Sequence, residues 1–289
     1  MRFWRRLAIR STLTLTGAAA ACAMTPVVQQ AAAQGKLEAH YRVSIAGLPI
    51  GSGAWVVDVE SDRYSMAASG QVSGLLKAFS SGDGTIAVRG TITGTRMASS
   101  SYAMNIRSRN KTDDVRMGFA GGAVKELAIE PPVEPNEDMV PLTEAHKRGV
   151  LDPISAGMIP AAGAGGLEPE ACRRTMSVFD GRQRYDLALS YKRMDRVKAE
   201  RGYEGLVLVC AVSYTPLGGH DPERAAVKAL RESREIEMWF APIAGTRFLG
   251  VYRIVLPTML GNAVLDATRF VTAPKSAAAR PGSANVKSQ

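Results

Sequence analysis

The stretch Ala39-His40-Tyr41-Arg42-Val43-Ser44-Ile45 alternates between apolar and polar residues. Alternation with a period of two puts every second side chain on the same face of a strand, so this segment fits a β-strand with one buried and one wet face. A register slip of one residue would turn Tyr41, Val43 and Ile45 out to water. The stretch therefore predicts a sheet whose pairing is fixed by an apolar face.

The same pattern recurs through most of the chain of 289 residues. Further alternating runs lie at residues 54–60, 63–70, 85–90, 102–107, 115–120, 175–179, 184–192, 206–214, 236–240, 249–256 and 263–271. Turn signals such as Gly47-Leu48-Pro49 and Gly82-Asp83-Gly84 separate them. Many short strands at near-regular spacing predict an all-β protein, with a curled antiparallel sheet that forms a spiral, a half-barrel or an open barrel.

Two segments carry helical signals, so we expect one or two short surface helices. Asp221-Pro222 is followed by good helix formers, which predicts a helix over residues 221–234. Asp152-Pro153 precedes a similar but shorter run that ends at Ile159. The proline-rich residues 130–150 before it predict a long connection between two halves of one sheet.

The first 33 residues have the features of an export signal. Four arginines (Arg2, Arg5, Arg6 and Arg10) precede an apolar run over residues 13–24, and a small-residue site follows at 31–33. We expect a signal peptide at residues 1–33, cleavage before Gln34 and a periplasmic location. A retained anchor is disfavoured because the run is shorter than the about 20 residues that span a bilayer. A lipid on Cys22 is disfavoured because no large aliphatic residue stands three places earlier.

Cleavage defines a single β-rich envelope domain at residues 34–273, followed by a small, basic and polar tail at residues 274–289 that we expect to be disordered. Removal of the four arginines lowers the formal charge from +9 to +5. The remaining basic residues are scattered and do not cluster with aromatic residues, so we expect no nucleic-acid partner. No later segment is long and apolar enough to predict a transmembrane span.

The sequence predicts one disulfide bond. Cys172 and Cys210 are the pair that remains after cleavage, and an even pair in an oxidising compartment favours a bridge. Such a bridge would stabilise the domain by about 3–4 kcal/mol. The alternative is two buried thiols on separate strands.

Residues with catalytic or metal-binding potential do not form a recognisable pattern. His40, His146 and His220 lie far apart and lack a second ligand at zinc spacing. Ser155 lacks the glycine-flanked turn of a hydrolase nucleophile and fits a backbone hydrogen-bonding role better. We therefore predict no catalytic residue, cofactor or metal, and we favour a protein that is not an enzyme.

The order of several short motifs resembles a known family. These motifs are Tyr41-Arg42-Val43, residues 47–51, residues 70–79, Asp152-Pro153-Ile154-Ser155 and Phe179-Asp180-Gly181. Over residues 37 to 271 the chain resembles exported bacterial proteins of the domain-of-unknown-function family 3108. The resemblance implies an envelope location and an all-β fold, and it implies no catalytic residues.

Two hypotheses for function follow. The first is a non-catalytic binding or scaffolding protein that supports envelope integrity, with a concave apolar groove for a lipid, a lipoprotein or another envelope protein. The second is an enzyme that acts on envelope polymers through a site not recognisable in the sequence. Large apolar residues support the first, although core packing is the simpler use of most of them: Trp55, Leu75, Leu76, Phe79, Met104, Met117, Met238, Trp239 and Phe240.

Overall fold

The computed structural model describes residues 34–73, 82–109, 111–134, 136–162 and 166–275, and strands occupy most of them. The expected signal peptide, Cys22 and three of the candidate groove residues (Leu75, Leu76 and Phe79) lie outside the described residues. All described residues belong to one compact unit.

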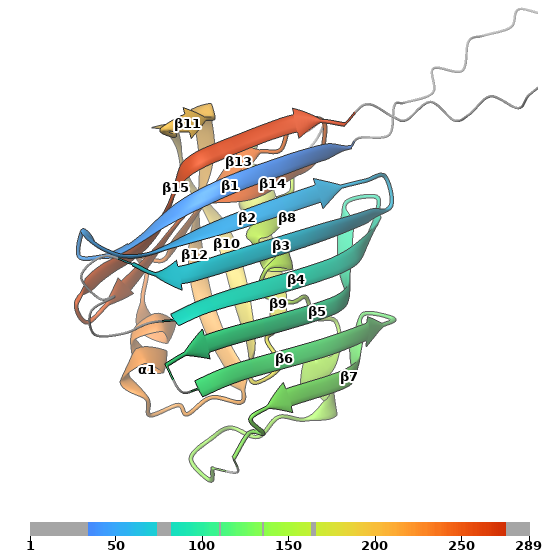
Figure 1. Ribbon diagram of the computed structural model, residues 1–289, viewed down its shortest axis with the longest axis vertical. Coiled ribbons are helices and arrows are strands. Elements are labelled where there is room, and N and C mark those ends of the chain that lie inside the picture. Colours follow the sequence, from blue (N-terminus) through green and yellow to red (C-terminus); the bar gives the residue numbers. More distant parts are fainter. Residues whose placement is uncertain (1–33, 74–81, 110, 135, 163–165, 276–289) are drawn as a thin grey trace, which may run out of the picture. The chain divides into compact units, whose positions relative to one another are not determined.

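The first half of the sheet is a meander of seven consecutive strands, each antiparallel to the next (Figure 1). The strands are β1 Gly35–Ile45, β2 Leu48–Val59, β3 Arg63–Val72, β4 Gly82–Thr93, β5 Arg96–Ser108, β6 Lys111–Ala120 and β7 Ala123–Glu130.

The second half contains the remaining strands and the helices. Its strands are β8 Met158–Pro160, β9 Arg174–Phe179, β10 Arg184–Lys198, β11 Arg201–Gly202, β12 Glu204–Gly218, β13 Glu237–Pro242, β14 Phe248–Thr258 and β15 Gly261–Pro274. The helices are the 3-10 turns η2 Glu144–Lys147, η3 Ser155–Gly157 and η4 Pro169–Cys172, and the α-helix α1 Ala225–Glu232.

The two halves form one sheet because the last strand pairs with the first. The strand order is β7-β6-β5-β4-β3-β2-β1-β15-β14-β13-β12-β10-β9, with β11 parallel to β15 and β8 antiparallel to β14. The ladder does not close into a barrel, because β7 and β9 are its two edges. The predicted all-β, curled antiparallel class is confirmed, and residues 131–157 connect the two halves as expected.

The two edges are nevertheless tied together by residues 148–151, which we call the seam segment. Single bridges join Arg148 to Ala123 at β7 and Leu151 to Val178 in β9. The Leu151 N–H donates to the Ser177 carbonyl at 2.8 Å, and the Phe179 N–H donates to the Leu151 carbonyl at 3.0 Å. The connection between the halves therefore fills the gap that the sheet leaves open.

An ion pair reinforces this tie beside the seam segment. The Arg182 guanidinium, in the turn between β9 and β10, contacts the Asp113 carboxylate of β6 at 2.6 Å. It also donates to the Pro131 carbonyl at 3.1 Å, just after β7. The Arg182 guanidinium thus links the turn after edge strand β9 to β6 and to the residue that follows edge strand β7.

The alternation that predicted the first strand is present in its burial pattern. Leu37, Ala39 and Tyr41 are buried, whereas His40 and Arg42 between and beside them are exposed. The buried side chains form the inner face of the sheet, which packs against the second half. The Tyr41 hydroxyl crosses to that half and donates to the Val251 carbonyl at 2.7 Å.

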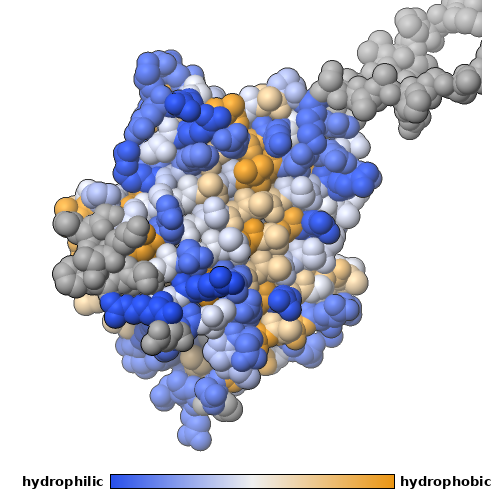
Figure 2. Space-filling view, in the orientation of Figure 1, coloured by the Kyte–Doolittle hydropathy of each residue, from blue (hydrophilic) through white to orange (hydrophobic). Residues whose placement is uncertain are grey.

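The outer face of the first half carries a row of small apolar residues that face one another across neighbouring strands. The row consists of Val56, Ala67, Ala87 and Ala103. Figure 2 shows this face, with a pale to orange band that crosses the strands between hydrophilic margins. Short side chains leave a shallow hollow of about 460 Å³ along this row.

The helices differ in part from those predicted. Helix α1 starts at Ala225, because the Asp221 side chain accepts the Glu223 N–H at 2.8 Å and holds a turn before it. None of its residues is buried, so it is the expected surface helix.

The helix predicted between Asp152 and Ile159 is wrong. The chain makes only the turn η3 and then extends into β8, which pairs with β14. None of the helices in the described part of the chain is long and apolar enough to cross a membrane.

The carboxyl-terminal boundary also differs from the expected one. Strand β15 continues to Pro274, within the segment expected to be a tail. The Lys275 N–H then donates to the Gln34 carbonyl at 3.0 Å, and its ammonium pairs with Asp58. The first and last described residues of the chain, Gln34 and Lys275, therefore lie side by side.

Candidate functional site

A groove lies on the inner face where β3 ends and β4 begins, and we call it the inner groove. Its floor contains Gly70 of β3 and Gly84 of β4, which face each other on adjacent strands, and Gly53 of β2 continues this row beside the groove. The cavity over Gly70 and Gly84 has a volume of about 450 Å³. Apolar side chains at its walls are those of Ala68, Val72, Ile86 and Ile106.

The groove exists because the second half covers only one end of the inner face. At the covered end, Tyr64, Met66 and Val88 are buried. Further along the same strands Ile86 is only partly buried, and Ile106 is 40% exposed. An apolar surface of this kind, hollowed and partly wet, is a usual place for ligand binding.

The glycines leave the floor of the inner groove without side chains. Among the described residues, the nearest neighbour of a Cβ atom at Gly70 would be the Ser52 carbonyl oxygen at 3.7 Å, so no described residue fills the space above this position. At Gly84 and Gly53 the nearest contacts would be 3.1 Å, which is tighter. Gly70 is therefore the position where the groove can be filled with least strain in the sheet.

Most of the large residues expected near a groove are core residues instead. Trp55, Met117, Met238, Trp239 and Phe240 are all buried. Met104 is partly buried and pairs with Ile86 of the groove wall. The sequence pattern did not single out the glycines or isoleucines of the inner groove, although the period-2 rule places them on the inner face.

A buried polar cluster lies at the covered end of the inner face. The Asp152 carboxylate accepts hydrogen bonds from the hydroxyls of Ser99 and Ser155 at 2.5 and 2.6 Å. It also accepts the backbone N–H groups of Ile154 and Ser155 at 3.0 and 2.9 Å. The Tyr64 hydroxyl lies 2.8 Å from the Ser155 hydroxyl.

This cluster anchors the chain after the long connection to strands β3 and β5. Asp152 and Ser155 have no exposed surface, so the Ser155 hydroxyl is placed as a structural group and not as an accessible nucleophile. Burial raises the pKa of the Asp152 carboxyl above its ordinary value, although the hydrogen bonds lower it in part. Burial, together with the nearby Asp152, raises the pKa of Tyr64 to about 12.

A cluster of charged residues lies on the second half of the sheet, and its positive and negative side chains form ion pairs with one another. Glu237 pairs with Lys192 at 2.7 Å and Arg193 at 2.9 Å, and it accepts the Trp239 indole N–H at 2.7 Å. Burial alone would raise the pKa of Glu237, but these partners lower it to about 2. Arg253 stacks on Trp239 and has its own carboxylate partner, Asp266. These positive charges are therefore already balanced.

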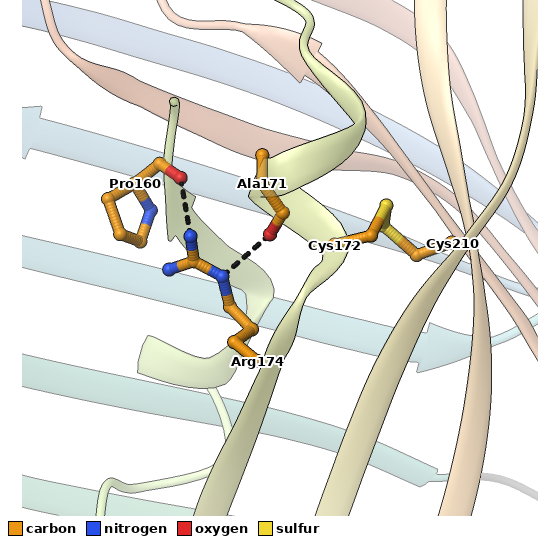
Figure 3. The surroundings of a disulfide bond; sticks show 5 residues. All are labelled: Pro160, Ala171, Cys172, Arg174 and Cys210. Carbon is orange, nitrogen blue, oxygen red and sulfur yellow. Dashed lines mark hydrogen bonds between the residues drawn. A yellow bond between two sulfur atoms is a disulfide. The ribbon is translucent and has the colours of Figure 1, made fainter. Parts of the chain in front are cut away.

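The predicted disulfide is present between Cys172 and Cys210 (Figure 3). It joins η4, which precedes β9, to the middle of β12, and the two Cα atoms are 5.6 Å apart. Both cysteines are fully buried. The bridge fixes the start of edge strand β9 to the interior of the second half.

The three histidines belong to three separate segments of the fold. His40 points outward on β1, His146 belongs to η2, and His220 is buried in the loop after β12. Within the described ranges, no group of three or more His, Cys, Asp and Glu residues could hold a metal ion.

Comparison with known proteins identifies the family of this chain. The fold and groove define an all-β protein built on a curled, open antiparallel sheet. The chain belongs to the family of proteins of unknown function DUF3108, whose model matches residues 40–268. No curated protein matches the sequence.

The chain is also similar to a solved structure, the beta-barrel-like protein of domain of unknown function DUF1849 from Brucella abortus. The two are 8% identical, and the match covers 83% of this chain and 98% of that one, with a TM-score of 0.43.

Proposed function

We propose that this chain is an exported, non-catalytic binding protein of the cell envelope that holds the acyl chain of a lipid or lipoprotein in the inner groove. The observation that carries this proposal is the pair Gly70 and Gly84 beneath apolar walls. Two facing glycines on adjacent strands leave a trough in the uncovered part of the inner face. A cavity of about 450 Å³ is within the range of small-molecule sites.

The periplasm is the location that we propose for this activity. The basic and apolar composition of residues 1–33 supports export. The disulfide supports an oxidising compartment. Amino-terminal sequencing of the exported protein tests the location: a mature chain that starts near Gln34 agrees with it, and an intact Met1 in the cytoplasm contradicts it.

Filling the inner groove should abolish acyl-chain binding. We expect Gly70→Leu to fold as the wild type does, since a Cβ there meets no atom of the described residues closer than 3.7 Å. Its side chain would occupy the trough and reduce lipid recovery by at least about tenfold, because the ligand would lose most of its apolar contact. Lipid extraction and mass spectrometry of protein purified from its native envelope measure the effect.

Ser65→Leu is the matched control, because Ser65 also belongs to β3, is exposed on the opposite, outer face and does not line the groove. This variant should retain the lipid content of the wild type. Equal lipid content in Gly70→Leu and wild type, or no lipid in the wild type itself, would contradict the proposed groove ligand.

A further inference from the structure

A second cavity lies at the opposite ends of β4 and β5 from the inner groove, and we call it the seam pocket. Its volume is about 570 Å³. The β4–β5 turn, the β6–β7 turn, the seam segment, β8 and the start of β9 surround it. It therefore lies where the open sheet is closed by the connection between its halves.

Part of the seam pocket is apolar. Met97, Met158 and Met176 line it from three separate strands, together with Leu151 of the seam segment; Met97 is partly exposed, and Met158 and Met176 are buried in the wall. Methionine side chains are flexible and polarisable, so they adjust to apolar ligands of different shapes.

The charged residues that line the pocket are both arginines, Arg96 and Arg174. The Arg174 Nε–H donates to the Ala171 carbonyl at 2.6 Å, and one terminal nitrogen donates to the Pro160 carbonyl at 3.0 Å (Figure 3). Both acceptors are neutral. The other terminal nitrogen has no protein partner among the described residues, and no described carboxylate lines the pocket.

This environment differs from that of other partly buried arginines in the fold. Arg182, Arg193 and Arg253 each contact a carboxylate within 3.0 Å. Among the described residues Arg174 has only carbonyl acceptors, and burial lowers the pKa of its guanidinium below the ordinary value. A partly desolvated cation without a counter-ion is unfavourable, and an anion within reach would relieve that cost.

We propose that the seam pocket binds a single-chain amphiphile with an anionic head. The head, a carboxylate or a phosphate monoester, contacts Arg174 and Arg96, and the alkyl chain lies along the three methionines. Arginine binds both kinds of oxyanion through paired N–H donors. This site is separate from the inner groove, so it does not depend on the function proposed there.

Titration calorimetry with four probes tests this site: decanoate, decyl phosphate, decanol and inorganic phosphate. We expect the two anionic amphiphiles to bind the full mature chain at least about tenfold more tightly than decanol or inorganic phosphate, because only they match both parts of the pocket. The ratio of decanoate to decyl phosphate affinity then distinguishes a fatty acid from a phosphate monoester as the better ligand.

Charge-removing variants identify the residues involved. Arg96→Gln is the cleaner change, because Arg96 is exposed, and it should weaken decanoate binding several-fold. Arg174→Gln should weaken it at least tenfold, and Arg174→Lys should recover part of the loss. Arg173→Gln is the matched control, since Arg173 pairs with Glu170 and does not line the pocket.

Three results would overturn the proposal. One is equal affinity for decanol and decanoate, which would remove the role of the anionic head. Another is unchanged decanoate affinity in Arg96→Gln, a result that would exclude the proposed head-group contact even if Arg174→Gln does not fold. The last is loss of decanoate binding in Gly70→Leu, which would place this ligand in the inner groove.

Discussion

Removal of the Cys172–Cys210 bridge should lower the free energy of unfolding by about 3–4 kcal/mol, since the bridge closes a loop of 38 residues. The bridge fastens edge strand β9 to the buried strand β12, and an edge strand has a partner on one side only. Without it we expect β9 and the adjoining seam segment to open first. Urea unfolding of Cys172→Ala, Cys210→Ala and the double variant measures the change.

The three variants also show whether the loss comes from the covalent bond. Either single substitution breaks the bridge, so the double variant should be only slightly less stable than each single variant. The wild type treated with a reductant should resemble them. Three variants as stable as the oxidised wild type would contradict a stabilising role for the bridge.

Replacing Asp152 by alanine should destabilise the fold by about 3–5 kcal/mol. The substitution leaves the hydroxyls of Ser99 and Ser155 and two backbone N–H groups without their acceptor in a fully buried place, and each such loss is costly. The matched control is Asp195→Ala, which removes a partly exposed carboxylate from the surface. That change should cost less than about 1 kcal/mol.

Asp152→Asn separates the shape of this residue from its charge. The pKa of the Asp152 carboxyl is raised in the folded protein, so the folded state binds the carboxyl proton more tightly than the unfolded chain does. The resulting stabilisation is fully present below the ordinary carboxyl pKa of 3.8 and is lost as the pH rises through the raised value. Asparagine does not titrate, so the stability of the wild type relative to Asp152→Asn should fall as the pH rises from about 4.

Urea unfolding of both proteins between pH 4 and pH 8 measures that difference. A difference that stays constant or rises with pH would contradict the raised pKa. Other carboxyls, such as Glu237 with its lowered pKa, act in the opposite sense but cancel because both proteins contain them.

Much of the sheet could be predicted because burial on one face leaves a readable alternation. Each of the twelve alternating runs lies largely within a strand of the structure, and most of these strands are longer than the run that predicted them. Strand β7 was missed because it is an edge, where Leu127 is 36% exposed and the apolar pattern is weak. Strands β8 and β11 were missed because three and two residues are too few to show a period.

The candidate sites were harder to predict than the strands. The disulfide followed from a count of cysteines, but the inner groove depends on the register that brings Gly53, Gly70 and Gly84 together. The seam pocket depends on the contact of five separate segments. Asp152-Pro153 resembles a helix start, yet the same carboxylate that could cap a helix is used to bind Ser99 of another strand. Tertiary contacts decided these features.

The pairing of β1 with β15 has a consequence for the order of folding. Gly35 at the start of β1 lies opposite Pro274 at the end of β15, so β1 lacks its second neighbour until β15 has been synthesised. During that interval the first meander has an unpaired strand at β1, and such edges invite wrong partners. The two halves of the sheet can therefore join only after β15 has formed. A chain truncated before β15 would lack the strand that connects β1 to β14.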